Sequence, residues 1–390
     1  MDPRFNPYAP GAGAKPPELA GRQTILERAA IALDRIRAGR QARGLMLYGL
    51  RGVGKTVLLN AMRLAAEAKG IVATAVEAPE GRSLPALLAP ALRQALLRLS
   101  PHKLVRDRAL AILAAFAKGV KVKYADVEVH LDVAPALGVA DSGDLEHDLG
   151  ELLMEIGRVA KAEGTVFALF IDELQYVEAA QLGMLIAAVH RVTQAESPIV
   201  LFGAGLPQLL GLAGRAKSYS ERLFEFAEVD RLSDEDAQRA LCVPAQNEGV
   251  RFSPEAVAEV LAQTRGYPYF LQEWGKHCWD AASASPITVN DARIARERAV
   301  AELDASFFRV RFDRLTPLEK IYLRAMAELG SGPYRSGDVA ERLGREVTAV
   351  APTRAALIAK GMAYSPAHGD IMFTVPLFDA FMRRSMSFPP

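Results

Sequence analysis

The residues Gly49-Leu50-Arg51-Gly52-Val53-Gly54-Lys55-Thr56 fit the pattern G-x-x-x-x-G-K-[ST] at every fixed position. An apolar run at 44–48 suits a buried strand before this stretch, and residues 57–68 have the apolar spacing of a helix after it. Because glycines adopt backbone conformations closed to other residues, such a loop turns successive N–H groups onto an anion at a helix N-terminus. The whole stretch therefore predicts a site for ATP, with Lys55 on the β- and γ-phosphates and the Thr56 hydroxyl on Mg²⁺. The alternative is a glycine-rich turn before an ordinary helix.

A second motif lies far downstream, where the apolar run 165–171 ends in Asp172-Glu173. A buried strand that ends there delivers Asp172 to the edge of a sheet, where its carboxylate can hold Mg²⁺ through water. The next residue, Glu173, can orient and deprotonate the water that attacks the γ-phosphate. Many strands end in acidic turns, so this signal is weak alone and gains its weight from the complete phosphate loop upstream.

Composition excludes several classes of protein. A chain of 390 residues predicts two or three domains, and its formal net charge of +1 gives no global signature of a polyanion-binding protein. Cys242 and Cys278 have neither metal-ligand spacing nor a disulfide pattern, which favours reduced cysteines. The N-terminus does not have the pattern of a signal peptide, and no apolar run is long enough to span a bilayer. We therefore expect a cytoplasmic protein with no membrane partner.

The order of strands and helices predicts an α/β fold. Residues 1–22, with five prolines in the first twenty, read as an extended arm rather than a packed element. From 23 to 230, strand patterns at 71–76, 165–171, 198–203 and 224–229 alternate with helical patterns, and both motifs end strands. This predicts a P-loop NTPase core, an αβα sandwich around a parallel sheet whose carboxyl edge carries the site. Residues 119–133 alternate apolar and polar and predict a hairpin, with His130 on the wet face rather than as a metal ligand.

Past 230 the strand patterns stop. Three helical patterns predict a small helical lid over 231–290, in which at least one of Trp274 and Trp279 serves as a core residue, and a charged linker helix follows over 291–312. Over 313–390, helices at 317–329, 336–343 and 352–360 and two short strands around the turn 366–370 predict a C-terminal winged helix-turn-helix. Residues 306–390 hold 12 Lys and Arg against 8 Asp and Glu, a net charge of +4. Four cations placed for DNA contacts are Arg335, Arg345, Arg354 and Lys360. A winged helix used for protein contacts is the alternative.

With these residues in place, the chain resembles the AAA+ and related STAND ATPases from about Pro17 to Arg384. The likeness is greatest to bacterial ATP-binding proteins related to the archaeal ATPase and origin-recognition initiator groups. Glu18-Leu19-Ala20-Gly21-Arg22 resembles the segment that packs over adenine, which implies nucleotide contacts for Gly21 and Arg22. Gly266-Tyr267-Pro268 resembles the GxP motif at the start of a lid helix, which implies the same for Pro268.

The resemblance also implies a catalytic arginine after the fourth core strand. Arg222 stands at that place, with Arg215 as second choice, and a merely solvated arginine is the alternative. Two departures from the family lie in Gly203-Ala204-Gly205, a turn without the polar sensor, and in Tyr269 and Phe270, which stand where a sensor arginine is common. Lost transition-state donors cost on the order of 10²–10³ in rate, so we expect slow hydrolysis.

The sequence thus predicts a slow ATPase switch whose nucleotide state controls the winged helix. The preferred output is binding of double-stranded DNA, as in a regulator of replication, transposition or transcription. The competing class is a signalling or scaffold ATPase, with the winged helix on a partner protein and ATP-dependent formation of a homo-oligomer. A small-molecule kinase is disfavoured by Glu173 and by the lid and winged-helix layout.

Overall fold

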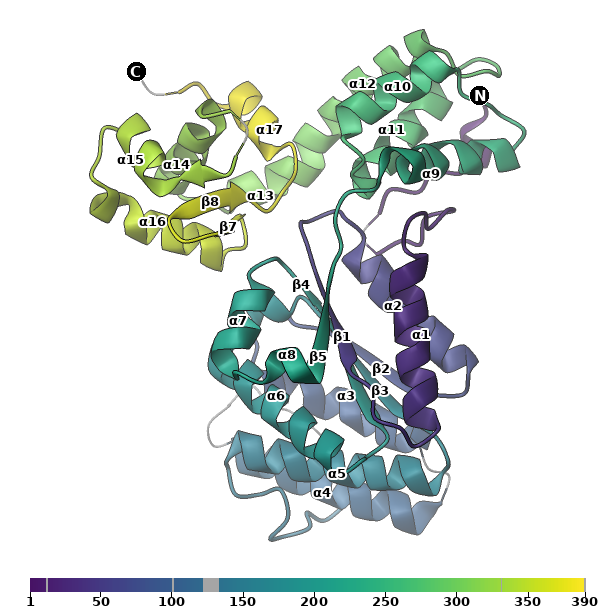
Figure 1. The fold of residues 1–390 in the computed structure, drawn as a ribbon, viewed down its shortest axis with the longest axis vertical. Coiled ribbons are helices and arrows are strands. Elements are labelled where there is room, and N and C mark those ends of the chain that lie inside the picture. The colour runs from purple at the N-terminus through teal and green to yellow at the C-terminus, as the bar shows by residue number, and fades with distance from the viewer. Residues whose placement is uncertain (12, 100–101, 122–132, 331, 389–390) are drawn as a thin grey trace. The chain divides into compact units, whose positions relative to one another are not determined.

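The computed structural model describes the chain except residues 12, 100–101, 122–132, 331 and 389–390 (Figure 1). The chain folds into two compact units. The sheet unit comprises Arg22–Tyr48 and Lys55–Glu228, and the helical unit comprises Met1–Gly21, Gly49–Gly54 and Val229–Pro390. In the described part of the chain, no helix combines the length and apolar character needed to cross a bilayer.

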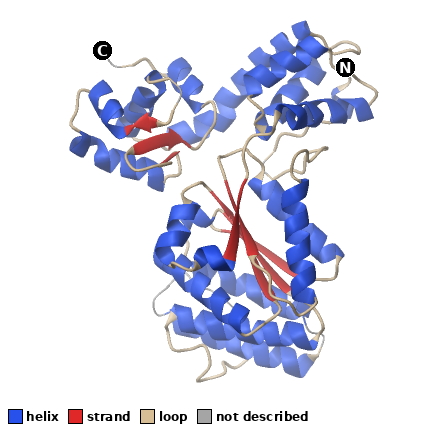
Figure 2. Cartoon of the chain, in the orientation of Figure 1, coloured by secondary structure: helices blue, strands red, loops and turns tan. Residues whose placement is uncertain are grey.

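The sheet unit is built on five parallel strands in the order β2-β3-β4-β1-β5 (Figure 2). Every residue of β3 is buried, as expected for a strand covered on both faces. The strands are β1 Gly44–Tyr48, β2 Val72–Glu77, β3 Phe167–Asp172, β4 Ile199–Gly205 and β5 Phe224–Glu228.

Helices cover both faces of this sheet. Phe167, Leu169 and Ile171 of β3 join the core that the helices α3 to α6 form. The intervening Phe170 lies on the other face of the sheet and stacks on Phe202 of β4, with ring centroids 5.0 Å apart. The helix α2 contacts β2, β3 and β4. The predicted αβα sandwich is therefore confirmed. Its helices are α1 Gln23–Arg37, α2 Lys55–Ala68, α3 Leu84–Leu99, α4 Lys103–Lys121, α5 Leu145–Ala162, α6 Ala179–Gln194, α7 Leu209–Ala216 and α8 Ser220–Leu223.

Two local predictions in the sheet unit were wrong. Gly203 and Gly205 do not form a turn but continue β4, paired with Met46 and Tyr48 of β1. A Cβ on Gly203 would lie 2.4 Å from the Leu174 side chain, so the crowded centre of the sheet requires glycine there. Residues 119–121, predicted as the start of a hairpin, are the end of α4. The rest of that hairpin through residue 132, with His130, lies outside the described residues.

The helical unit begins with four helices, of which α12 continues through a π-helical turn into α13. Phe270 of α11 and Phe308 of the π-helical turn are both buried in its core. The core role predicted for at least one of Trp274 and Trp279 is confirmed, and both are buried. Cys242 and Cys278 are free thiols. The elements are α9 Asp234–Asn247, α10 Pro254–Thr264, α11 Pro268–Ala281, α12 Val289–Leu303, the π-helical turn η3 Asp304–Phe308 and α13 Arg309–Asp313.

The C-terminal part has the winged-helix order of helix, strand, two helices and a two-stranded wing, followed by a last helix. Its antiparallel sheet has the order β6-β8-β7. The third helix begins at Val347, five residues before the predicted start, and Pro352 lies inside it. The elements are α14 Pro317–Glu328, β6 Tyr334–Arg335, α15 Ser336–Arg342, α16 Val347–Ala359, β7 Ala363–Tyr364, β8 Asp370–Phe373 and α17 Phe378–Ser385.

The N-terminal arm is packed, contrary to prediction. It contains one short 3-10 helix, η1 Pro3–Phe5. Tyr8 is buried, its ring fills the space that a Cβ on Gly275 would occupy, and its hydroxyl donates to the carbonyl of Leu241. The prolines explain why the arm has little regular structure. They do not predict that the Tyr8 ring packs against another part of the chain.

Candidate nucleotide site

The phosphate loop has the backbone that its glycines predict. Gly52 and Gly54 have φ values of 77° and 94°, in the left-handed region that residues with a Cβ rarely adopt. A Cβ on Gly49 would lie 2.0 Å from the carbonyl oxygen of Val229. Each fixed glycine of the motif is thus required by the conformation or by a close approach of backbone.

The outer side of this loop is bound within the helical unit. The amide N–H of Arg51 donates to the carbonyl of Thr374, which follows β8, over 2.9 Å. The carbonyl of Gly52 accepts from the amide of Tyr269 at the start of α11, over 3.1 Å. The loop therefore contacts both the lid and the winged helix through its own backbone.

Lys55 and Thr56 are the first residues of α2, and the structure brings them to Asp172 at the end of β3. The Thr56 hydroxyl donates to Asp172 Oδ2 over 2.6 Å. Lys55 is 8% exposed, and its charge acts to lower the pKa of Asp172. Burial outweighs this and the hydrogen bonds, so the pKa of Asp172 is raised.

A third carboxylate at this edge comes from Glu77, which sequence reasoning missed. Glu77 lies opposite Asp172 in the register of β2 and β3. Its pKa is raised, first by burial and then by the charges of Asp172 and Glu173. Mg²⁺ takes oxygen ligands, and a threonine hydroxyl and carboxylates supply them here. Its positive charge would favour the ionised form of these crowded carboxylates, whose pKa values are raised without it. The residues present therefore fit the predicted metal, with Thr56 and Asp172 as its holders.

Glu173 has a strained backbone and a partner that was not predicted. Its φ of 55° lies in the left-handed region, which is uncommon for a residue other than glycine and concentrates at functional sites. Gln175 donates through Nε2 to the Glu173 carboxylate, and its Oε1 accepts from the amide of Leu206, just after β4, over 2.9 Å. Gln175 thus ties Glu173 to the end of β4. Its place two residues after the acidic pair was the only signal in the sequence.

Arg222 is not brought to these residues. It lies on α8, directly before the amino end of β5, and is exposed. Because β5 runs parallel to β1, Arg222 lies at the edge of the sheet opposite to the one that carries Asp172, about one strand length or 16 Å away. Arg215, the second choice, is exposed in the last turn of α7.

The other residues predicted to contact the nucleotide, Gly21, Arg22 and Pro268, lie at or just before the starts of helices. Gly21 has a φ of 67°, and a Cβ there would lie 2.6 Å from the carboxylate of Asp236. Arg22 is buried and directly precedes α1. Pro268 is the first residue of α11, after Gly266, where a Cβ would lie 2.7 Å from the Leu232 carbonyl.

A five-stranded parallel sheet with a glycine loop, a buried lysine and a Thr–Asp pair at its carboxyl edge defines a P-loop nucleoside triphosphatase. Residues 18–202 match the family described as AAA ATPase domain. The AAA+ resemblance seen in the sequence is therefore confirmed over this part of the chain. Residues 305–382 match a second family, described as a domain of unknown function (DUF8462).

Among solved structures, the chain is similar to the Walker-type ATPase PABY2304 of Pyrococcus abyssi, with 15% identity and a TM-score of 0.61 over 94% of this chain and 96% of that one. The RuvB Holliday junction branch migration motor of Thermotoga maritima matches with 16% identity and a TM-score of 0.47, over 97% and 100%. The Orc1 protein of Aeropyrum pernix in complex with DNA matches with 17% identity and a TM-score of 0.47, over 96% and 95%. The first likeness shows a shared fold, and the other two are too low to carry a conclusion. No curated protein has a sequence that matches this chain significantly.

Proposed function

We propose that this protein is a slow ATP-hydrolysing switch. The observation that carries the proposal is the 2.6 Å contact of Thr56 with Asp172 beside the buried Lys55. In this proposal Lys55 and the loop Gly49–Gly54 bind the phosphates, and Thr56 and Asp172 hold Mg²⁺, which would stabilise the charge that develops on the γ-phosphate. Glu173 accepts a proton from the attacking water.

The proposed slow rate follows from the restraint on Glu173. Its carboxylate accepts from Gln175, so one lone pair that would hold water is already used. The end of β4 offers only Gly203, Ala204 and Gly205, which carry no side-chain donor. We expect a steady-state turnover below about 1 s⁻¹, at the lower end of typical enzymes, in a phosphate-release assay with saturating Mg²⁺ and ATP. A turnover above about 10 s⁻¹ would contradict the proposed switch.

The backbone contacts of the phosphate loop support a coupled output. Arg51 and Gly52 bond to Thr374 and Tyr269, so any shift of the loop on binding phosphate acts on both partners. A ligand shifts such an arrangement only by its differential affinity for the two states. We propose that ATP binding changes these two hydrogen bonds and thereby biases the lid and the winged helix.

The winged helix favours a protein partner over DNA. In a DNA-binding winged helix, the third helix reads base edges with polar side chains. The exposed face of α16 carries a single hydroxyl, and Val347 is 47% exposed. Its exposed residues are Val347, Thr348, Ala349, Ala351, Pro352, Ala355 and Ala359.

Some of the cations that the sequence offered for DNA are used within the domain. Arg354 donates to Ser365 Oγ and to the Asp370 carbonyl over 2.9 and 2.8 Å, which fastens the wing to α16. Lys360 pairs with Glu319 over 2.8 Å, and Arg335 pairs with Asp370 over 3.3 Å. Arg354 and Lys360 are therefore engaged inside the domain, whereas the Arg335 side chain stays 71% exposed beside its partner. Arg335 and Arg345, the latter exposed between α15 and α16, are the two of these four cations that still support the candidate function of DNA binding.

We propose that α16 docks onto another copy of this chain, and the substitution Val347→Asp tests this. An aspartate on the exposed apolar face disfavours burial there without affecting the core. We expect sedimentation with a slowly hydrolysed ATP analogue to show association that Val347→Asp weakens at least about 10-fold.

The same samples distinguish DNA binding. The matched variant is Arg345→Ala, which removes an exposed cation and leaves the apolar face. Binding of a labelled duplex that falls about 10³-fold between 50 and 200 mM salt, and that Arg345→Ala weakens, would assign the output to DNA instead.

A further inference from the structure

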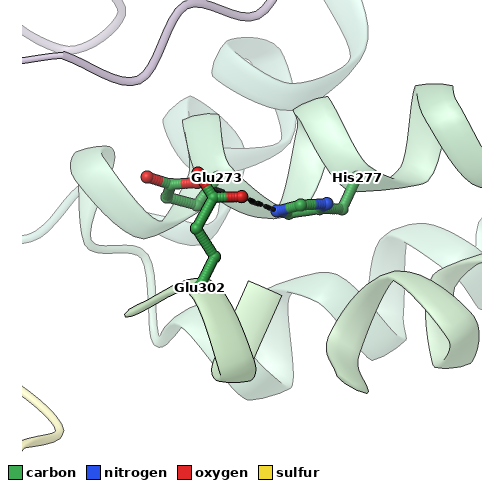
Figure 3. A group of neighbouring side chains, drawn as sticks. All are labelled: Glu273, His277 and Glu302. Carbon is green, nitrogen blue, oxygen red and sulfur yellow. Dashed lines mark ion pairs between the residues drawn. The ribbon is translucent and has the colours of Figure 1, made fainter. Parts of the chain in front are cut away.

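Three titratable side chains meet between two helices of the helical unit. Glu273 and His277 lie one turn apart on the same side of α11, and Glu302 lies in the last turn of α12. Figure 3 shows both carboxylates and the imidazole pointing toward one another. One ligand atom from each residue lies within 4.8 Å of the other two.

The spacing of these atoms suits a small dication. His277 Nε2 lies 3.0 Å from Glu302 Oε2 and 4.0 Å from Glu273 Oε2. Zn²⁺ binds imidazole nitrogen and carboxylate oxygen at about 2.0–2.2 Å, so tetrahedral ligand atoms lie about 3.4 Å apart. The two observed separations lie on either side of that value, and small side-chain rotations would equalise them.

Two of the three ligand atoms are buried without a hydrogen-bond partner among the described residues. Glu273 is 4% exposed and its Oε2 has none, and His277 Nε2 has none either. The contact of His277 with Glu302 has the distance of an ion pair but not the direction of an N–H···O hydrogen bond. Buried polar atoms are nearly always bonded, because an unbonded one loses its hydration without a compensating hydrogen bond. Both orphaned atoms face the same point, so a single cation there would satisfy both.

The charges around this point favour a cation. Glu273 and Glu302 carry two negative charges, and Lys276 offsets one, by bonding to Glu302 over 3.0 and 3.2 Å. Burial raises the pKa of Glu273, with a further rise from the charge of Glu302. Burial also lowers the pKa of His277, which keeps its imidazole neutral and able to act as a ligand. The Tyr269 side chain hydrogen-bonds the Glu273 carboxylate and opposes the rise in the pKa of Glu273. Because Glu273 Oε2 has no partner among the described residues, a cation beside it would favour the ionised form.

We propose that Glu273, His277 and Glu302 form a Zn²⁺ site, with water in the fourth position. A histidine with two carboxylates is a donor set for Zn²⁺, whereas Mg²⁺ prefers oxygen ligands in an octahedron. The ion would fasten α11 to the end of α12, just before the π-helical turn. This site is independent of the proposed ATPase mechanism.

Titration of the metal-stripped, full-length protein with Zn²⁺ in the absence of nucleotide tests the site. We expect one high-affinity Zn²⁺ per chain, a higher Tm on loading, and with Co²⁺ the visible absorption of a tetrahedral site. His277→Gln should lower the affinity at least about 100-fold and remove the Tm rise. The matched control is His368→Gln, at an exposed histidine of the turn before β8, which should bind as the wild type does.

Glu302→Gln serves if His277→Gln fails to fold, because Glu302 lies at the rim with a side chain 44% exposed. It too should weaken Zn²⁺ binding. Absence of Zn²⁺ binding, or binding unchanged in both variants, would overturn the proposal and leave an ordinary His277–Glu302 ion pair. Since no ATP is present, failure here says nothing about the ATPase, and failure of the ATPase says nothing about this site.

Discussion

Glu173→Gln will bind ATP as tightly as the wild type and hydrolyse it about 10²–10⁴-fold more slowly. The amide cannot accept the proton of the attacking water, while its size remains that of the carboxylate and its one carbonyl oxygen can still accept from Gln175. Glu173 sits one residue beyond Asp172, outside the pair that Thr56 forms. Phosphate release and calorimetry on the same sample measure the two effects separately.

The matched control for this variant is Glu178→Gln. Glu178 is exposed five residues further on, and among the contacts described its carboxylate bonds only to Gln181 of α6, over 3.0 Å. Its turnover should stay within about twofold of the wild type, as for most surface substitutions. Equal turnover of Glu173→Gln and the wild type would remove Glu173 from the mechanism.

Lys55→Ala will lower both ATP affinity and turnover, the latter by at least about 10³-fold. Lys55 is the fixed lysine of the motif, whose positive charge the proposal places on the β- and γ-phosphates, and in a buried setting a charge-assisted bond is stronger than in water. Its removal also leaves Asp172 without a neighbouring cation, so metal-free Asp172 becomes harder to ionise. Fluorescent-nucleotide titration and phosphate release measure the two losses.

Lys69→Ala is the matched control, because Lys69 follows the other end of α2, about 21 Å from Lys55. It loses a surface ion pair with Asp34 of 2.7 Å, which is worth at most about 1 kcal/mol.

We propose that the exposed Arg222 acts on the nucleotide of a neighbouring copy. Mixing Lys55→Ala with Arg222→Ala should then restore activity that neither variant has alone, and additive residual rates would exclude this role.

Local sequence was enough to predict the phosphate loop and the strand that carries Asp172. The loop is specified by glycines whose conformations other residues avoid, and Asp172 ends an apolar run that only a buried strand explains. These signals depend on neighbours in the chain, so they survive without knowledge of the fold. The strand order β2-β3-β4-β1-β5 was not predicted, because it depends on which strands pair after long connections.

The residues that were missed depend on partners distant in sequence. Glu77 reaches Asp172 only through the pairing of β2 with β3, 95 residues apart in register. Lys360 was read as a DNA contact because nothing near it in the sequence reveals its pairing with Glu319. Two further features were missed for the same reason, because packing between distant elements creates them. They are the buried Tyr8 and the group of Glu273, His277 and Glu302.

The central claim is that Lys55, Thr56 and Asp172 act on one Mg-triphosphate. Calorimetric titration with ATP, once in Mg²⁺ and once in excess EDTA, tests this claim most directly. We predict that Mg²⁺ strengthens binding to the wild type, that Thr56→Ala and Asp172→Asn each remove most of this gain, and that the double variant loses no more, because both side chains hold the same ion. Independent, additive losses from the two substitutions, or ATP binding that does not respond to Mg²⁺, would contradict the account.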